Sequence, residues 1–69
     1  MNNMKKILAK IERIHRRGKA TLNLQRSSPF YKYNGQTFIV DSIGHPGYKC
    51  RVTLIIRHKK VNFTVHDML

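Results

Sequence analysis

Acidic side chains are scarce in this chain of 69 residues, which has three carboxylates, Glu12, Asp41 and Asp67, against fourteen lysines and arginines. The formal net charge is therefore +11 at pH 7. Since most basic side chains lack an acidic partner within the chain, they repel one another in the folded state, and a bound polyanion relieves that repulsion. Three carboxylates are also too few for a two-metal nuclease centre, so we expect no metal and no other cofactor.

Cysteine is also nearly absent, because Cys50 is the single cysteine of the chain. An intramolecular disulfide and a four-cysteine zinc site are thus excluded, and nothing indicates an oxidising compartment. We expect Cys50 to act as a small buried hydrophobic residue.

Long apolar runs are missing as well. No stretch approaches the ~18 residues that a helix needs to cross a bilayer. Residues 1–18 begin with positive charge, as a signal peptide does, but Lys10, Glu12 and Arg13 interrupt the apolar core that such a peptide requires. We therefore expect a soluble cytoplasmic protein without a membrane partner.

The apolar residues that are present follow a clear pattern. They make up 41% of the chain, and nine Val, Ile and Leu side chains lie between Phe38 and Val65. This is too apolar for a disordered basic tail, and the length allows one small domain, residues 1–69, near the lower limit for a self-sufficient core.

The first segment has the spacing of an amphipathic helix, expected over residues 4–17. A cap at Asn2 or Asn3 and a left-handed Gly18 would begin and end it. Basic residues in the last turn interact favourably with the partial negative charge at the C-terminal end of a helix. The apolar residues at i, i+3, i+4 and i+7 are Met4, Ile7, Leu8, Ile11 and Ile14.

After Gly18 the apolar period changes to two, which indicates strands. Asn34-Gly35 predicts a type I′ hairpin, because both residues tolerate positive φ. The strand after it is expected to be buried on both faces, with Phe38 and Val40 on one side and Ile39 and Ile43 on the other, under the helix. The five expected strands span 20–25, 30–33, 36–43, 48–57 and 61–66, with further turns at 44–47 and 58–60.

The expected fold class is α+β: an N-terminal amphipathic helix followed by an antiparallel meander of about five strands. A bent five-strand sheet can close its edges, so we favour a small SH3-like or Sm-like barrel, with one helix packed on an open antiparallel sheet as the alternative. The order of a helix and then five strands is similar to that of Sm-like proteins, but element order does not fix function. Unsealed edges would leave room for a homo-oligomer.

Basic residues gather in two places. The helix stripe comprises Lys6, Lys10, Arg13 and Arg17, which lie beside the apolar face, with Arg16 nearby. The strand cluster comprises Lys49, Arg51, Arg57, Lys59 and Lys60. In the strand expected over 48–57, Lys49, Arg51, Thr53, Ile55 and Arg57 share one face, while Tyr48, Cys50, Val52, Leu54 and Ile56 share the other.

A single basic stripe is most often a solvated helix surface, but two elements that independently concentrate positive charge favour nucleic-acid binding. We expect DNA or RNA to be bound mainly through phosphates, with weak sequence preference. The sequence has no helix-turn-helix spacing, zinc finger or aromatic RNP motif. The tyrosines next to Lys32 and Lys49, namely Tyr31, Tyr33 and Tyr48, either stack on unpaired bases or pack half-buried.

Two other functions are compatible with the same composition. A small regulator that binds an acidic protein would use the same positive surface. A metal-independent ribonuclease would use histidines as general acid and base, although spacing does not show that any two converge, and we expect no enzyme. The candidate histidines are His15, His45, His58 and His66.

Overall fold

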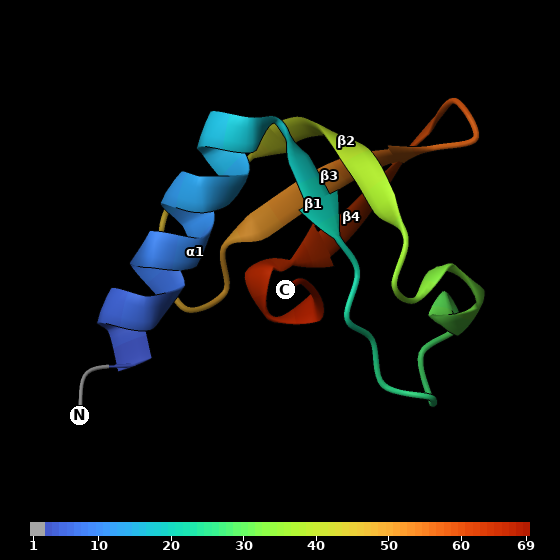
Figure 1. The fold of residues 1–69 in the computed structure, drawn as a ribbon, viewed down its shortest axis with the longest axis horizontal. Coiled ribbons are helices and arrows are strands. Elements are labelled where there is room, and N and C mark those ends of the chain that lie inside the picture. The colour runs from blue at the N-terminus through green and yellow to red at the C-terminus, as the bar shows by residue number, and fades with distance from the viewer. Residues whose placement is uncertain (1–2) are drawn as a thin grey trace.

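One long helix packs beside a twisted antiparallel sheet in the computed structural model, which describes residues 3–69 (Figure 1). The strands follow one another in the order β1-β2-β3-β4, and each pairs antiparallel with its neighbour in sequence. The elements are α1 (Asn3–Arg17), β1 (Lys19–Thr21), η1 (Tyr31–Tyr33), β2 (Thr37–Ile43), β3 (Arg51–Ile56), β4 (Lys59–Thr64) and η2 (Val65–Asp67), where η marks a 3₁₀-helix.

The helix expected over 4–17 is confirmed. Ile7, Ile11 and Ile14 are buried, whereas Leu8 lies at the margin of the apolar face and is 44% exposed. Gly18 ends α1 with φ 68°, and its N–H donates to the carbonyl of Ile14 at 2.9 Å. The cap expected at Asn2 or Asn3 lies outside the residues whose side chains are described.

The sheet is open and has four strands, which matches the alternative architecture of one helix packed on an antiparallel sheet. The strand expected over 30–33 is wrong, because residues Tyr31–Tyr33 form η1. The first strand ends earlier than expected, at Thr21, yet its alternation holds: Ala20, Leu22 and Leu24 are all buried.

The hairpin expected at Asn34-Gly35 is also wrong, because β2 pairs with β1 and β3 instead. Asn34 has φ −58° and ψ 136°, Gly35 has φ 81°, and the N–H of Gln36 donates to the carbonyl of Tyr33 at 3.1 Å. These are features of a type II turn. The Asn34 side chain is used elsewhere, since its Oδ1 accepts from the N–H of Leu24 at 2.7 Å.

The tight hairpin of this fold joins β3 to β4. Ile56 pairs with Lys59, and the two residues between them, Arg57 and His58, both have positive φ, 52° and 68°. Positive φ at both central residues is the requirement of a type I′ turn, which glycine and asparagine usually meet. Arg57 is therefore a turn residue, not the strand residue expected from its place in 48–57.

A β-bulge at Asp41 changes the faces of β2. The register shifts between Val40, opposite Leu54, and Ser42, opposite Thr53, so Ile43 comes to lie opposite Val52. Because directly paired residues project on the same face, Ile43 joins the core face. Burial of β2 on both faces is thus wrong: Ile39 projects on the other face, opposite Ile55, and is 60% exposed.

The core lies between α1 and one face of the sheet. Val52, Leu54 and Ile56 of β3 are buried, as their alternation predicts, and Phe63 packs edge-on against Phe30 with ring centroids 5.3 Å apart. Further buried residues are Ile7, Ile11, Ile14, Ala20, Leu22, Leu24, Cys50, Val65 and Met68.

The C-terminal segment returns to the end of β1. Leu22 forms an isolated antiparallel bridge with Met68, and the N–H of Leu69 donates to the carbonyl of Thr21 at 3.0 Å. The short helix η2 that leads there has a capping box, in which the Asp67 carboxylate accepts from the Thr64 N–H at 3.1 Å. The last strand is accordingly Lys59–Thr64 and not 61–66.

Candidate nucleic-acid interface

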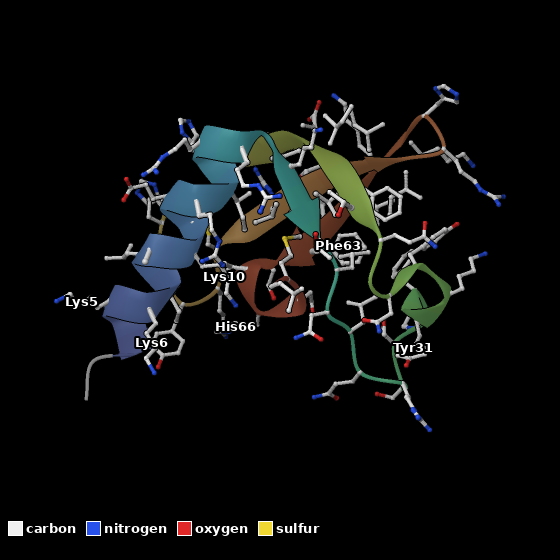
Figure 2. All side chains as sticks on the ribbon, viewed as in Figure 1. Lys5, Lys6, Lys10, Tyr31, Phe63 and His66 are labelled. Carbon is white, nitrogen blue, oxygen red and sulfur yellow. The ribbon has the colours of Figure 1, made fainter. Side chains whose placement is uncertain are left out.

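The helix stripe lies on the flank of α1, beside the apolar face that packs on the sheet. Lys6, Arg13 and Arg17 are exposed. Lys10, which Figure 2 labels, is half-buried, and its Nζ donates to the backbone carbonyl of Met68 at 2.9 Å. Three members of the stripe therefore face solvent, while the fourth also ties α1 to the C-terminus.

All three carboxylates are already engaged. Glu12 pairs with Arg16 at 2.7 Å, Asp41 lies 3.7 Å from the Nζ of Lys60, and Asp67 caps η2. The pair of Glu12 and Arg16 is an exposed (i, i+4) pair, which contributes little to stability. Within residues 3–69, no side-chain carboxylate is left to neutralise the exposed members of the helix stripe.

The strand cluster divides into two groups. Lys49 lies in the loop before β3 and Arg51 begins that strand, whereas Arg57 lies in the turn at the other end of β3 and Lys59 follows that turn. All four side chains are exposed. The expected shared strand face of Lys49, Arg51 and Arg57 is therefore wrong, because Arg51 alone of the three belongs to β3.

The two groups lie at opposite ends of the molecule. The turn between β3 and β4 projects on the side away from α1, along the longest dimension of 35 Å (Figure 1). The loop before β3 instead lies next to α1, where Tyr48 contacts the same hollow as Ile7. The helix stripe and Lys49 thus form one basic end, and Arg57, Lys59 and Lys60 form the other.

A hollow of ≈ 280 Å³ opens at the α1 end and is lined by Lys6, Ile7, Tyr48 and His66. We call it the Tyr48 hollow. The rings of Tyr48 and His66 lie 5.7 Å apart with a tilt of 37°, and Tyr48 is 49% exposed. The sequence places Tyr48 and His66 among candidates of two different functions, and no local pattern shows that they meet.

The other tyrosines differ in their surroundings. Tyr33 is half-buried and packs edge-on against Phe38 with ring centroids 5.8 Å apart, and the Nζ of Lys32 lies 5.2 Å from its ring centre. Tyr31 is 36% exposed in η1. Tyr33 is therefore a packing residue, while Tyr31 and Tyr48 each present a solvent-accessible ring.

The candidate histidines belong to four separate segments: His15 to α1, His45 to the loop before β3, His58 to the turn after it, and His66 to η2. A second hollow, of ≈ 300 Å³, is lined by Ile14, His15, Gly18 and residues 40–43. Over the described part of the chain, no three His, Cys, Asp or Glu residues are grouped as a metal site would require.

Cys50 is buried, as expected. Its Sγ lies 3.7 Å from the carbonyl oxygens of both Gly44 and Arg51, which the thiol can reach as a weak donor. Burial raises the pKa of the thiol, and the charge of Arg51 opposes that shift. The thiol is thus a structural group.

Comparison with known proteins finds no matching family model, and no curated protein or solved structure with significant similarity. Among residues 3–69, no helix is long and apolar enough to span a membrane.

Proposed function

We propose that the protein binds nucleic acid, DNA or RNA, mainly through phosphates and with weak sequence preference. The observation that carries the proposal is the helix stripe, where Lys6, Arg13 and Arg17 are exposed along one flank of α1. The three carboxylates of the chain are engaged elsewhere.

The mechanism is counterion release. Each lysine or arginine that contacts a phosphate displaces condensed cations from the polymer, which favours binding at low salt. Arginine adds bidentate hydrogen bonds to phosphate oxygens. Rows of such contacts position a polymer without reading its bases, so affinity for generic duplexes should be in the non-specific range of about 10⁻⁴ to 10⁻⁶ M.

The β3–β4 hairpin, with Arg57 in its turn and Lys59 and Lys60 at the start of β4, supplies a second contact at the far end of the same molecule. A polymer that reached both ends would extend over the long dimension of 35 Å. This is about ten base pairs of duplex at 3.4 Å per step. We therefore include Arg57, Lys59 and Lys60 in the proposed interface as a separate patch, together with Lys49 and Arg51 near α1.

We further propose that the sheet belongs to a small barrel of SH3-like or Sm-like element order. Support comes from the bridge of Leu22 with Met68 and from the N–H of Asn23, which donates to the carbonyl of Asp67 at 2.8 Å. In this interpretation the C-terminal residues act as a short fifth strand. Slow amide exchange at Asn23 and Leu69 would support it, and rapid exchange would contradict it.

The cytoplasm is the compartment that we propose, in keeping with a single, structural cysteine.

The purified protein provides the first test. Copurifying nucleic acid is seen as a raised ratio of absorbance at the nucleic-acid and protein maxima, and nuclease treatment removes it. Fluorescence anisotropy with labelled DNA and RNA, checked on a gel for intact polymer, then measures binding. Saturable binding to either polymer supports the proposal. Absence of binding to both at low salt contradicts it, and an acidic protein is then the partner to seek.

A further inference from the structure

The Tyr48 hollow combines an aromatic surface with a cation at the basic end of the molecule. Tyr48 and His66 supply rings 5.7 Å apart, and Lys6 and Ile7 supply the adjoining wall. Half of Tyr48 is accessible although the ring is anchored on one side by His66. An accessible ring beside a lysine is the combination on which unpaired bases and their phosphates bind.

The three elements that form the hollow are held in place by hydrogen bonds between them. Lys10 joins α1 to the C-terminus through the Met68 carbonyl, 2.9 Å from its Nζ. The N–H of Val65, the first residue of η2, donates to the carbonyl of Cys50 at 2.8 Å, which fixes η2 against the end of the Tyr48 loop. The rings of Tyr48 and His66 are thus placed before any ligand binds, which reduces the entropy lost on binding.

From this arrangement we infer that the Tyr48 hollow binds an unpaired nucleotide, so that single-stranded DNA or RNA is the preferred form of the polymer. The base stacks on Tyr48 and its phosphate contacts Lys6. This inference rests on the proposed nucleic-acid binding and adds the strandedness of the ligand. Paired bases in a duplex cannot offer a free face to a side-chain ring, whereas phosphates are available in both forms.

Tyr31 offers a matched control. It is the other accessible tyrosine, and it too is next to a lysine in sequence, but it lies in η1 and the Nζ of Lys32 lies over the ring of Tyr33 (Figure 2). Figure 2 shows Lys6 and His66 near the start of α1 and Tyr31 on the opposite side of the molecule. A general effect of removing an exposed tyrosine would appear equally at both positions.

The test compares a short oligo(dT), an oligo(U) of the same length and a mixed-sequence duplex by anisotropy, with the wild-type protein, Tyr48→Leu, Tyr48→Phe and Tyr31→Leu. Tyr48→Leu should weaken binding of both single strands by about 5- to 150-fold, the range for one stacked base, and leave duplex affinity unchanged. Tyr48→Phe, which keeps the ring, and Tyr31→Leu should both bind like the wild type.

A measurement on the unmodified protein complements the variants. On addition of oligo(dT), the NMR signals of the Tyr48 and His66 rings should shift while those of the Tyr31 ring stay in place. The inference is overturned if these shifts are absent, or if Tyr48→Leu affects single strands and duplex equally or neither. Failure of the proposed function is a different result: the wild-type protein then binds none of the three polymers at low salt.

Discussion

Lys10 and Met68 are 58 residues apart in the chain, yet the Nζ of Lys10 donates a hydrogen bond to the Met68 carbonyl at 2.9 Å. One cation of the helix stripe is therefore partly structural. It holds α1 against the C-terminal segment, beside the Tyr48 hollow. The remaining members of the stripe, Lys6, Arg13 and Arg17, have their side chains exposed to solvent.

Replacing Lys10 by Met should therefore destabilise the fold by about 1 kcal/mol, because the Met68 carbonyl loses its charged donor while the aliphatic stem is kept. Arg13→Met removes the same charge from an exposed position and should change the free energy of unfolding by less than about 0.5 kcal/mol. Urea denaturation measures both. Equal effects at the two positions would show that the contact with Met68 contributes nothing.

Asparagine and glycine, the residues usual in a type I′ turn, should stabilise the turn between β3 and β4. Arg57 and His58 have φ of 52° and 68°, which is costly for residues with a Cβ. Arg57→Asn with His58→Gly should stabilise the protein by about 1 kcal/mol. The control, Arg57→Ala with His58→Ala, removes the same side-chain charge without easing the backbone and should give no gain. Thermal unfolding of the two double variants would contradict this interpretation if their midpoints coincide.

Thr53 and Asn62 are paired across β3 and β4, and substitutions at the two positions should have different effects on stability. Thr53 is 5% exposed, and its Oγ1 donates to the Oδ1 of Asn62 at 2.7 Å, whereas Asn62 itself is exposed. Asn62→Ala leaves the buried hydroxyl without its acceptor and should cost about 1 to 2 kcal/mol. Thr53→Val leaves an exposed amide that water can serve and should cost less. Chemical denaturation of both variants tests the order, and the reverse order would exclude this explanation.

The Cys50 thiol should be inert in the folded protein. Burial raises its pKa, so the native state holds the thiol proton more tightly than the unfolded chain does. The contribution of the Cys50 thiol to the free energy of unfolding is therefore fully present at pH values below the ordinary pKa of cysteine. It is lost as the pH rises through the higher pKa of the folded state. Iodoacetamide labelling, followed by mass spectrometry at mildly alkaline pH, should be slow in buffer and rapid in urea. Equal rates would show an accessible thiol.

Regular, long patterns in the sequence predicted the parts of the fold that depend on periodicity. The helical spacing of Ile7, Ile11 and Ile14 is long enough to be unambiguous, and the alternation of Val52, Leu54 and Ile56 identifies the core face of β3. Both signals are repeated several times within one element, and burial of one face satisfies them all.

Single local signals were less informative. Asn-Gly suits a type II turn as well as a type I′ turn. The long-range pairing of β2 with β1 and β3, which the dipeptide does not encode, determines that the type II turn forms. The turn predicted at 58–60 begins one residue earlier, at Arg57 and His58, and neither residue is the glycine or asparagine that a type I′ turn usually has. The bulge at Asp41 is one extra residue, and it reverses the side on which Ile43 lies.

The candidate site also has one part that the sequence predicts and another that only the structure reveals. The helix stripe could be predicted because its members recur within one helix. The Tyr48 hollow could not, because Lys6, Tyr48 and His66 come from three elements that tertiary packing brings together. The structural role of Lys10 could not be predicted either. Its Nζ donates to the backbone carbonyl of Met68, and a backbone group has no signature in the sequence.

The salt dependence of binding is the most direct test of the helix stripe as a phosphate-binding surface. The logarithm of the association constant should fall with the logarithm of salt concentration, with a slope of about −0.9 per phosphate contacted on duplex DNA. Reversal of charge at Lys6, Arg13 and Arg17 to Glu should lower affinity and reduce the magnitude of the slope by about 2 to 3.

The matched control reverses the same number of exposed charges outside both basic clusters, at Lys19, Arg26 and Lys32. Its net charge equals that of the stripe variant, so long-range attraction is lowered equally in the two proteins. We predict that the control keeps a slope close to that of the wild type while the stripe variant does not. Equal slopes in the two triple variants would contradict phosphate contacts by the helix stripe.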